Sequence, residues 1–177
     1  MKYFDLIKNF VDQEFTRAQR AHHELNHFDR AVYWLKILKP DADEACLSAA
    51  YSHDIERAFR GETEKSLEGK NFQEEYYTKQ HPKKGAEIIA EFLAENNAPL
   101  DFINKVSVLI ANHETGGTDE QNLIKDADSI SFLEDKGKID RFIERTALQG
   151  KEAIKNKFDW MFDCITAPKA KEIARPF

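Results

Sequence analysis

His53 and Asp54 stand side by side after a stretch of small and apolar residues that runs from Ala45 to Tyr51. Imidazole and carboxylate groups are ligands that divalent cations take when no thiolates are at hand, and neighbours at a helix end can reach the same ion. The chain has six histidines, all in its first two-thirds: His22, His23, His27, His53, His81 and His113. The pair therefore predicts a metal centre, and a catalytic one if coordination positions remain for water and substrate.

Helices are the elements that the sequence predicts around this pair. Apolar residues recur at spacings of three and four in the stretches 4–15, 32–38, 45–51, 88–93, 102–110, 123–133 and 139–162. In this interpretation His27 opens the second helix, Asp41 caps the third, and Asp119 caps the helix that carries Asp128. No pair of strands with a hairpin turn stands out. We expect an all-α fold, a compact bundle of about seven to nine helices with no significant sheet.

Composition argues against several other classes of protein. Hydrophobic residues make up 41% and charged residues 33%, as in ordinary soluble proteins, and the formal net charge of −6 argues against nucleic-acid binding. The two cysteines form no CxxC pair, and neither a signal peptide nor an apolar run of roughly 18 residues is visible. We expect a cytoplasmic protein without a membrane partner, and a homodimer is left open.

One domain over residues 1–177 is the organisation expected for a chain of this length. Its metal-site core is expected at 27–128, and helices from 138–175 are expected to pack on that core. Residues 60–80 differ from the rest, because glycines and many charged residues interrupt the helical pattern there. We interpret this segment as a loop or lid that can include one helical turn.

Five sequence elements, taken in order, resemble the HD-domain metal-dependent phosphohydrolase superfamily. The segments are 27–32, like the family's opening His-x-x-Arg-Val helix; 45–55, like its LAALLHDI helix; 81–93, like its middle histidine-containing helix; 106–113, like its helix ending in histidine; and 126–128, like its DAD segment. The tail 166–174 also resembles the ending of one bacterial branch. Each element alone is weak, but their order over nearly the whole chain makes the match specific.

The resemblance implies a ligand set for one metal ion, namely His27, His53, Asp54 and Asp128. His81 and His113 would then hold a second ion or contact the substrate, and a single ion is the favoured interpretation. Glu114 follows His113 where some two-metal members have a second histidine, which weakens the case for two ions. The ion is left open among Mn, Mg, Co, Zn, Ni and Fe.

The same resemblance implies hydrolysis of a phosphate ester or anhydride by a metal-activated water, with a nucleotide as the favoured small-molecule substrate. Asp54 or Glu56 would orient or deprotonate that water, and Arg57 would supply a positive charge. The candidates for binding phosphate are Arg30, Lys83 and Lys84. Two other functions stay open: a regulatory module that binds metal and nucleotide without turnover, and a diiron oxygenase on the same scaffold.

Overall fold

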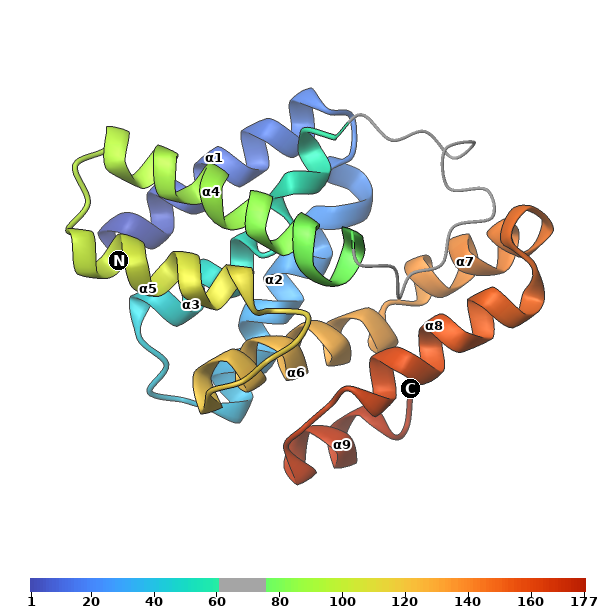
Figure 1. Ribbon diagram of the computed structural model, residues 1–177. Helices are drawn as coiled ribbons and strands as arrows, with labels where there is room; N and C mark the ends of the chain where they lie inside the picture. Colours follow the sequence, from blue (N-terminus) through green and yellow to red (C-terminus); the bar gives the residue numbers. More distant parts are fainter. Residues whose placement is uncertain (61–75) are drawn as a thin grey trace.

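The computed structural model of the chain describes residues 1–60 and 76–177 (Figure 1). These residues form nine α-helices and no strand, which confirms the all-α prediction. The helices are α1 (Lys2–Arg17), α2 (Ala21–Leu38), α3 (Glu44–Ser52), α4 (His81–Glu95), α5 (Leu100–Ala111), α6 (Asp119–Glu134), α7 (Lys136–Gln149), α8 (Lys151–Asp163) and α9 (Pro168–Ala174). A 3-10 turn, η1 (Ile55–Ala58), follows α3, and a π-helical turn, η3 (Tyr76–Gln80), precedes α4. Most of the predicted 60–80 loop, residues 61–75, lies outside the described residues.

Two helix starts differ from the sequence prediction. The cap of α3 is Asp43, not Asp41, because the Asp43 carboxylate accepts a hydrogen bond from the Cys46 backbone N–H at 2.9 Å. The cap of α6 is Thr118, whose side chain forms a capping box with Gln121. Asp119 is instead the first residue of that helix, where its negative charge interacts favourably with the positive end of the helix dipole. Each such cap is worth about 1 kcal/mol.

The prediction that His27 opens the second helix is also wrong. Helix α2 begins at Ala21, so His27 lies almost two turns inside it. The turn before His27 contributes Glu24, which is buried and faces the same side of the helix, three residues away. The C-terminal stretch divides into α7, α8 and α9, and α7 begins at Lys136.

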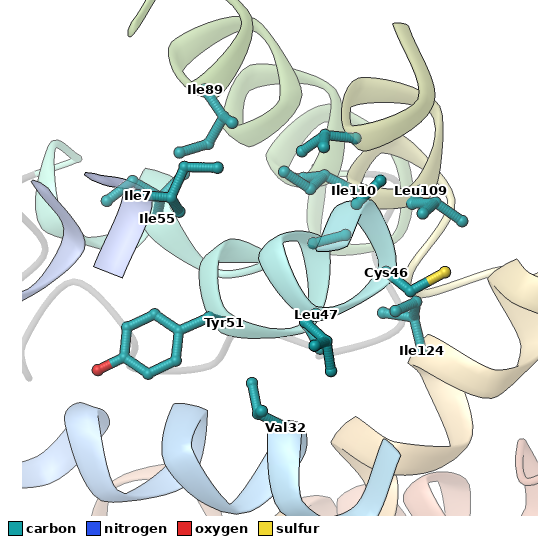
Figure 2. Packing of buried hydrophobic residues seen from close by; sticks show 14 of the residues in the cluster. Ile7, Val32, Cys46, Leu47, Tyr51, Ile55, Ile89, Leu109, Ile110 and Ile124 are labelled. Atoms are coloured by element: carbon teal, nitrogen blue, oxygen red, sulfur yellow. The ribbon is translucent and has the colours of Figure 1, made fainter. Parts of the chain in front are cut away.

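Helix α3 forms the centre of the larger of two apolar cores. All its residues from Ala45 to Ser52 are buried, which explains why this stretch is rich in small residues that allow neighbouring helices to approach. Figure 2 shows Ile7, Ile55, Ile89 and other residues packed around it, from α1, η1 and α4. This central position makes the end of α3, where His53 follows, the point at which several helices meet.

Helix α6 joins the larger core to the smaller one. Ile124 and Ala127 belong to the larger core, whereas Ile130 and Leu133 belong to the smaller core that α7, α8 and α9 complete. In Figure 1, α6 accordingly lies between the α1–α5 group and the C-terminal helices. Asp128 therefore stands on the helix that both cores share. No helix in the described ranges is long and apolar enough to cross a membrane.

Candidate metal centre

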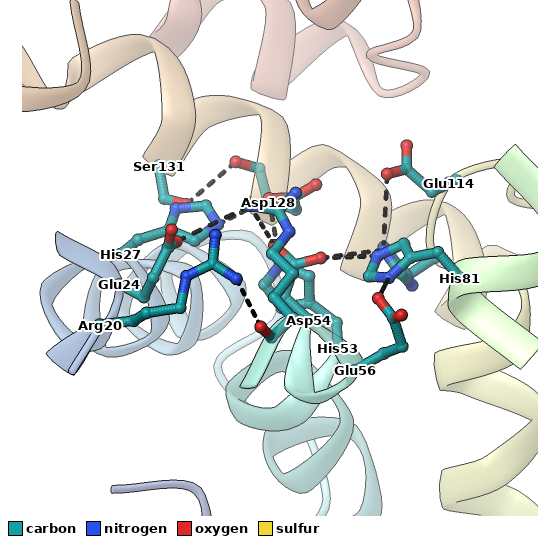
Figure 3. A network of polar contacts seen from close by, with 12 residues as sticks. Arg20, Glu24, His27, His53, Asp54, Glu56, His81, Glu114, Asp128 and Ser131 are labelled. Carbon is teal, nitrogen blue, oxygen red and sulfur yellow. Dashed lines mark hydrogen bonds and ion pairs between the residues drawn. The ribbon is translucent and has the colours of Figure 1, made fainter. Parts of the chain in front are cut away.

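The four predicted ligands converge from three different helices. His27 comes from α2, His53 and Asp54 follow α3, and Asp128 comes from α6 (Figure 3). The Nε2 atom of His27 lies 3.0 Å from Asp128 Oδ1, and the Nε2 atom of His53 lies 3.3 Å from the same oxygen. His53 Nε2 is also 3.5 Å from Asp54 Oδ2. All four side chains are nearly or fully buried.

Backbone carbonyls fix the tautomers of two histidines. The Nδ1 atom of His53 lies 2.9 Å from the carbonyl oxygen of Ala50, and Nδ1 of His113 lies 2.8 Å from that of Ile110. A carbonyl oxygen only accepts hydrogen bonds, so each Nδ1 carries the proton and donates it. In the neutral ring Nε2 is then the atom with the lone pair, as metal binding requires.

Ser131 fixes the third ring in the same way. Its hydroxyl donates to the carbonyl oxygen of Asp128 at 2.9 Å, so its oxygen accepts the Nδ1 proton of His27 at 2.7 Å. The His27 lone pair therefore points from Nε2 toward Asp128. Ser131 was not singled out from the sequence, and its position three residues after Asp128 on α6 is the signal that could have identified it.

His81 and Glu56 extend the cluster on the far side of Asp54. His81 stands at the start of α4, with Nε2 2.8 Å from Asp54 Oδ1 and Nδ1 2.9 Å from Glu56 Oε2. His113 Nε2 is 3.8 Å from Asp54 Oδ1 and 3.7 Å from Glu114 Oε1. Asp54 therefore lies between the histidines: its Oδ2 atom faces His53, and its Oδ1 atom faces His81 and His113.

The charges of the cluster shift the acidities of its members. Burial acts to raise the pKa of Asp54, but the charges of Arg57 and His53 outweigh it and hold that pKa well below its usual value. The pKa of Asp128 is likewise held far down against burial by His53 and His27. Burial acts to lower the pKa of His53, yet the Asp54 and Asp128 carboxylates raise it to about 9. The two carboxylates are ionised near neutral pH and attract positive charge.

Two overlapping groups of side chains could each hold a metal ion. One consists of His27, His53 and Asp54, the other of Asp54, His81 and His113, and in each group the ligand atoms lie within 4.8 Å of one another. A third such group, Asp43, Cys46 and Glu120, is of another kind. There the ammonium of Lys105 lies 2.7 Å from Asp43 and 2.9 Å from Glu120, so a lysine already supplies the positive charge.

Arg57 and the predicted phosphate-binding residues lie in different surroundings. Arg57 is at the centre, with Nη1 2.9 Å from Asp54 Oδ2 and 3.7 Å from Glu24 Oε2. Arg30 instead donates two hydrogen bonds to the Glu134 carboxylate, at 2.7 and 2.8 Å, and its guanidinium stacks over the Tyr33 ring. Lys83 and Lys84 are exposed on the first turn of α4. The structure therefore brings only Arg57 of this set to the histidine cluster.

Several charged residues around the cluster were not assigned a role from the sequence. Glu24 lies between two arginines, with Oε2 3.7 Å from Arg57 and Oε1 4.0 Å from Arg141 of α7. Burial acts to raise the pKa of Glu114, but contact with His113 lowers it. Lys157 of α8 has a lowered pKa because burial outweighs the nearby carboxylate of Glu114. The residues from α7 and α8 carry no local motif, so only the packed fold identifies them.

The comparison with protein families agrees with this geometry. The model of the HD domain family matches residues 13–133, which include every histidine of the cluster. The chain therefore belongs to the HD domain family, the metal-dependent phosphohydrolase superfamily predicted from its motifs. No curated protein and no solved structure matches the chain.

Proposed function

We propose that this protein is a metal-dependent phosphohydrolase that cleaves a phosphate ester or anhydride, with nucleotides as the first substrate class to test. The observation that carries the proposal is the orientation of the imidazole rings. The Nε2 atoms of His53 and His113 are buried and have no hydrogen-bond partner among the described residues. Both Nε2 atoms face carboxylate oxygens, so these positions favour a positive charge. That charge is either a proton, as the raised pKa of His53 shows, or a metal ion that takes the place of the proton.

The donor set fits a hard or borderline divalent ion. It offers imidazole nitrogens and carboxylate oxygens and no thiolate, which suits Mn, Fe, Co, Ni, Zn or Mg. We assign one ion to His27, His53, Asp54 and Asp128, and we assign His81 and His113 to the substrate side of the centre. Outer contacts from Ser131 and the Ala50 carbonyl hold the rings, as in other metal centres.

Around this centre the chain itself supplies orientation and charge. A bound divalent ion would lower the pKa of a water and polarise a phosphoryl oxygen. We assign Asp54 the role of orienting that water, because one of its oxygens faces His53 while the other faces His81. Arg57, beside Asp54, provides positive charge for the phosphoryl oxygens. Glu56 bonds the opposite nitrogen of His81, so we assign it the role of positioning that ring rather than that of general base.

A nucleotide panel with metal-loaded protein tests the proposal. Purified protein with Mn²⁺, Co²⁺ or Mg²⁺ is expected to release phosphate or pyrophosphate from at least one nucleotide or related phosphate ester. Asp54→Asn should abolish this release and weaken metal binding. Release from no substrate, or equal release by Asp54→Asn, would contradict the proposal. Metal binding without turnover would support the regulatory alternative.

A second candidate is a diiron oxygenase, because the Asp54, His81 and His113 group could hold another ion beside the first. In that case the purified protein would contain two equivalents of iron. One equivalent of another metal, together with hydrolysis in the nucleotide panel, would exclude this candidate.

A further inference from the structure

We infer that Arg57, Arg141 and Lys157 form a binding site for a phosphate group, and that the C-terminal helices thereby complete the site. The inference rests on the proposed function and deepens it. Two of these three cations, Arg141 of α7 and Lys157 of α8, lie outside the residues that the HD family model matches. In Figure 1 these two helices, orange to red, pack against α6 on the side away from α3 and α5.

The position of Lys157 is the first observation. Its ammonium lies 4.5 Å from the centre of the Trp160 ring and 5.4 Å from that of Phe132, so two aromatic faces hold it. Phe132 stands one turn after Asp128 on α6, so the Lys157 ammonium lies beside the face of α6 that carries Asp128. Burial of an ammonium is unfavourable, and a bound anion would add to the compensation that the Glu114 carboxylate provides.

The arginine pair is the second observation. Arg57 and Arg141 approach different oxygens of Glu24, at 3.7 and 4.0 Å, so one carboxylate is shared by two guanidinium groups. The Nε–H groups of both arginines are buried and have no hydrogen-bond acceptor among the described residues. A buried donor without an acceptor costs roughly 1–3 kcal/mol. These donors belong to the side chains best suited to bind phosphate oxygens, through two parallel hydrogen bonds.

The three cations come from three elements, η1, α7 and α8. Arg57 pairs with Asp54, Arg141 meets Arg57 at Glu24, and Lys157 lies beside the α6 face that carries Asp128. This is the arrangement that a phosphate bound beside a metal ion requires, because its oxygens carry charge on every side. A purely structural role for Lys157 would be to hold α8 against the loop after α5 through Glu114. That role predicts lost stability upon substitution and no effect on anion affinity.

Titration calorimetry of inorganic phosphate into the Mn²⁺-loaded full chain distinguishes the two roles. Lys157→Met and Arg141→Met are each expected to weaken phosphate binding by roughly tenfold or more, as for the loss of a charged hydrogen bond. Mn²⁺ affinity should stay at the wild-type value. Lys155→Met is the matched control, because Lys155 is exposed on the same helix and pairs with Asp159 there. Lys157→Arg keeps the charge and should retain most of the phosphate affinity.

Unchanged phosphate affinity in Arg141→Met and Lys157→Met would overturn the inference, as would wild-type protein that binds no phosphate. If Lys157→Met does not fold, Arg141→Met and Lys157→Arg still decide it. The measurement needs no turnover. Phosphate binding that depends on Lys157 in a protein that hydrolyses no substrate would therefore contradict the proposed hydrolase and leave the anion site standing.

Discussion

The Oγ atom of Ser131 lies 2.7 Å from Nδ1 of His27, and the same hydroxyl donates its proton to the carbonyl oxygen of Asp128. Because the residue that fixes the ring belongs to the same helix as the ligand that faces the ring, α6 controls both the tautomer of His27 and the position of Asp128. The smaller apolar core, which anchors the far end of α6, is therefore coupled to the geometry of the metal centre.

Ser131→Ala is expected to weaken metal affinity by about 10- to 100-fold, the usual effect of losing a group that orients a metal-bound histidine. Without the hydroxyl, the His27 ring can adopt the other tautomer and turn Nε2 away from its role as ligand. Calorimetric titration with Mn²⁺ measures the change. Ser129→Ala is the control on the same helix, because that hydroxyl contacts Cys164. Equal affinities for the two variants would show that the Ser131 contact is dispensable.

The number of bound ions can be determined by substitutions on the two sides of Asp54. We expect one equivalent of metal in the wild-type protein, one in His113→Ala, and none in His53→Ala after desalting. His113 would then affect substrate binding, seen as a higher KM, more than metal binding. Elemental analysis measures the stoichiometry. Two equivalents in the wild type that fall to one in His113→Ala would establish a two-metal centre.

Much of the fold and site could be predicted from the sequence because local signals specify it. Helical periodicity identifies the helices. Residues adjacent in sequence, such as His53 and Asp54, lie close together in any fold. Exact helix starts were less predictable, since Asp41 and Asp43 are equally plausible caps and only the packed backbone selects Asp43. The end of α3 was placed correctly, because the apolar run stops there.

The surroundings of the ligands could not be predicted, because they depend on contacts between distant residues. Arg30 lies one turn after His27, yet its partner is Glu134, more than a hundred residues away in the chain. Lys157 lies beside the cluster only because α8 packs against α6. A positive charge close to a motif histidine is consistent with phosphate binding. The packing of distant helices, however, decides which group pairs with that charge.

The Asp43 cap should make stability depend on pH in the acid range. Burial acts to raise the pKa of Asp43, but hydrogen bonds from Lys105 and the Cys46 backbone lower it to about 2. The unfolded value is about 4, so this group stabilises the fold fully above about pH 4 and loses that effect as the pH falls toward 2.

Asp43→Ala is accordingly expected to cost about 1 kcal/mol in the free energy of unfolding at pH 7. Asp43→Asn keeps a cap without the charge and should cost less, because the carboxylate is half-exposed and its pair with Lys105 is screened by solvent. Urea unfolding at a series of pH values should show both differences from the wild type shrinking below about pH 4. A constant difference down to pH 3 would contradict the assigned pKa.

The turn before α6 depends on Gly116, which has a φ of 71°. A Cβ atom there would lie 2.2 Å from Asn122 Oδ1, so Gly116→Ala combines left-handed strain with a clash. We expect a loss of about 1–2 kcal/mol from the strain alone. Gly150→Ala is the matched control, because Gly150 has a φ of 84° but nothing within 4 Å of such a Cβ. Thermal unfolding of the two variants separates strain from clash, and equal stabilities would show that Asn122 moves aside without cost.

Metal binding should stabilise the fold. The ligands come from α2, the end of α3 and α6, so they are close together only in the folded chain, and the ion binds the folded state but not the unfolded state. At a free Mn²⁺ concentration of about 100 times Kd, the expected gain is about 2.7 kcal/mol. For a chain of this size the gain corresponds to a rise in Tm of roughly 5–10 °C, and EDTA should reverse it. Asp128→Asn should lose most of the rise, since Asp128 faces both His27 and His53. Glu134→Gln is the control on the same helix, because Glu134 pairs with Arg30. A Tm that changes with neither Mn²⁺ nor EDTA would contradict the assignment of these residues as ligands.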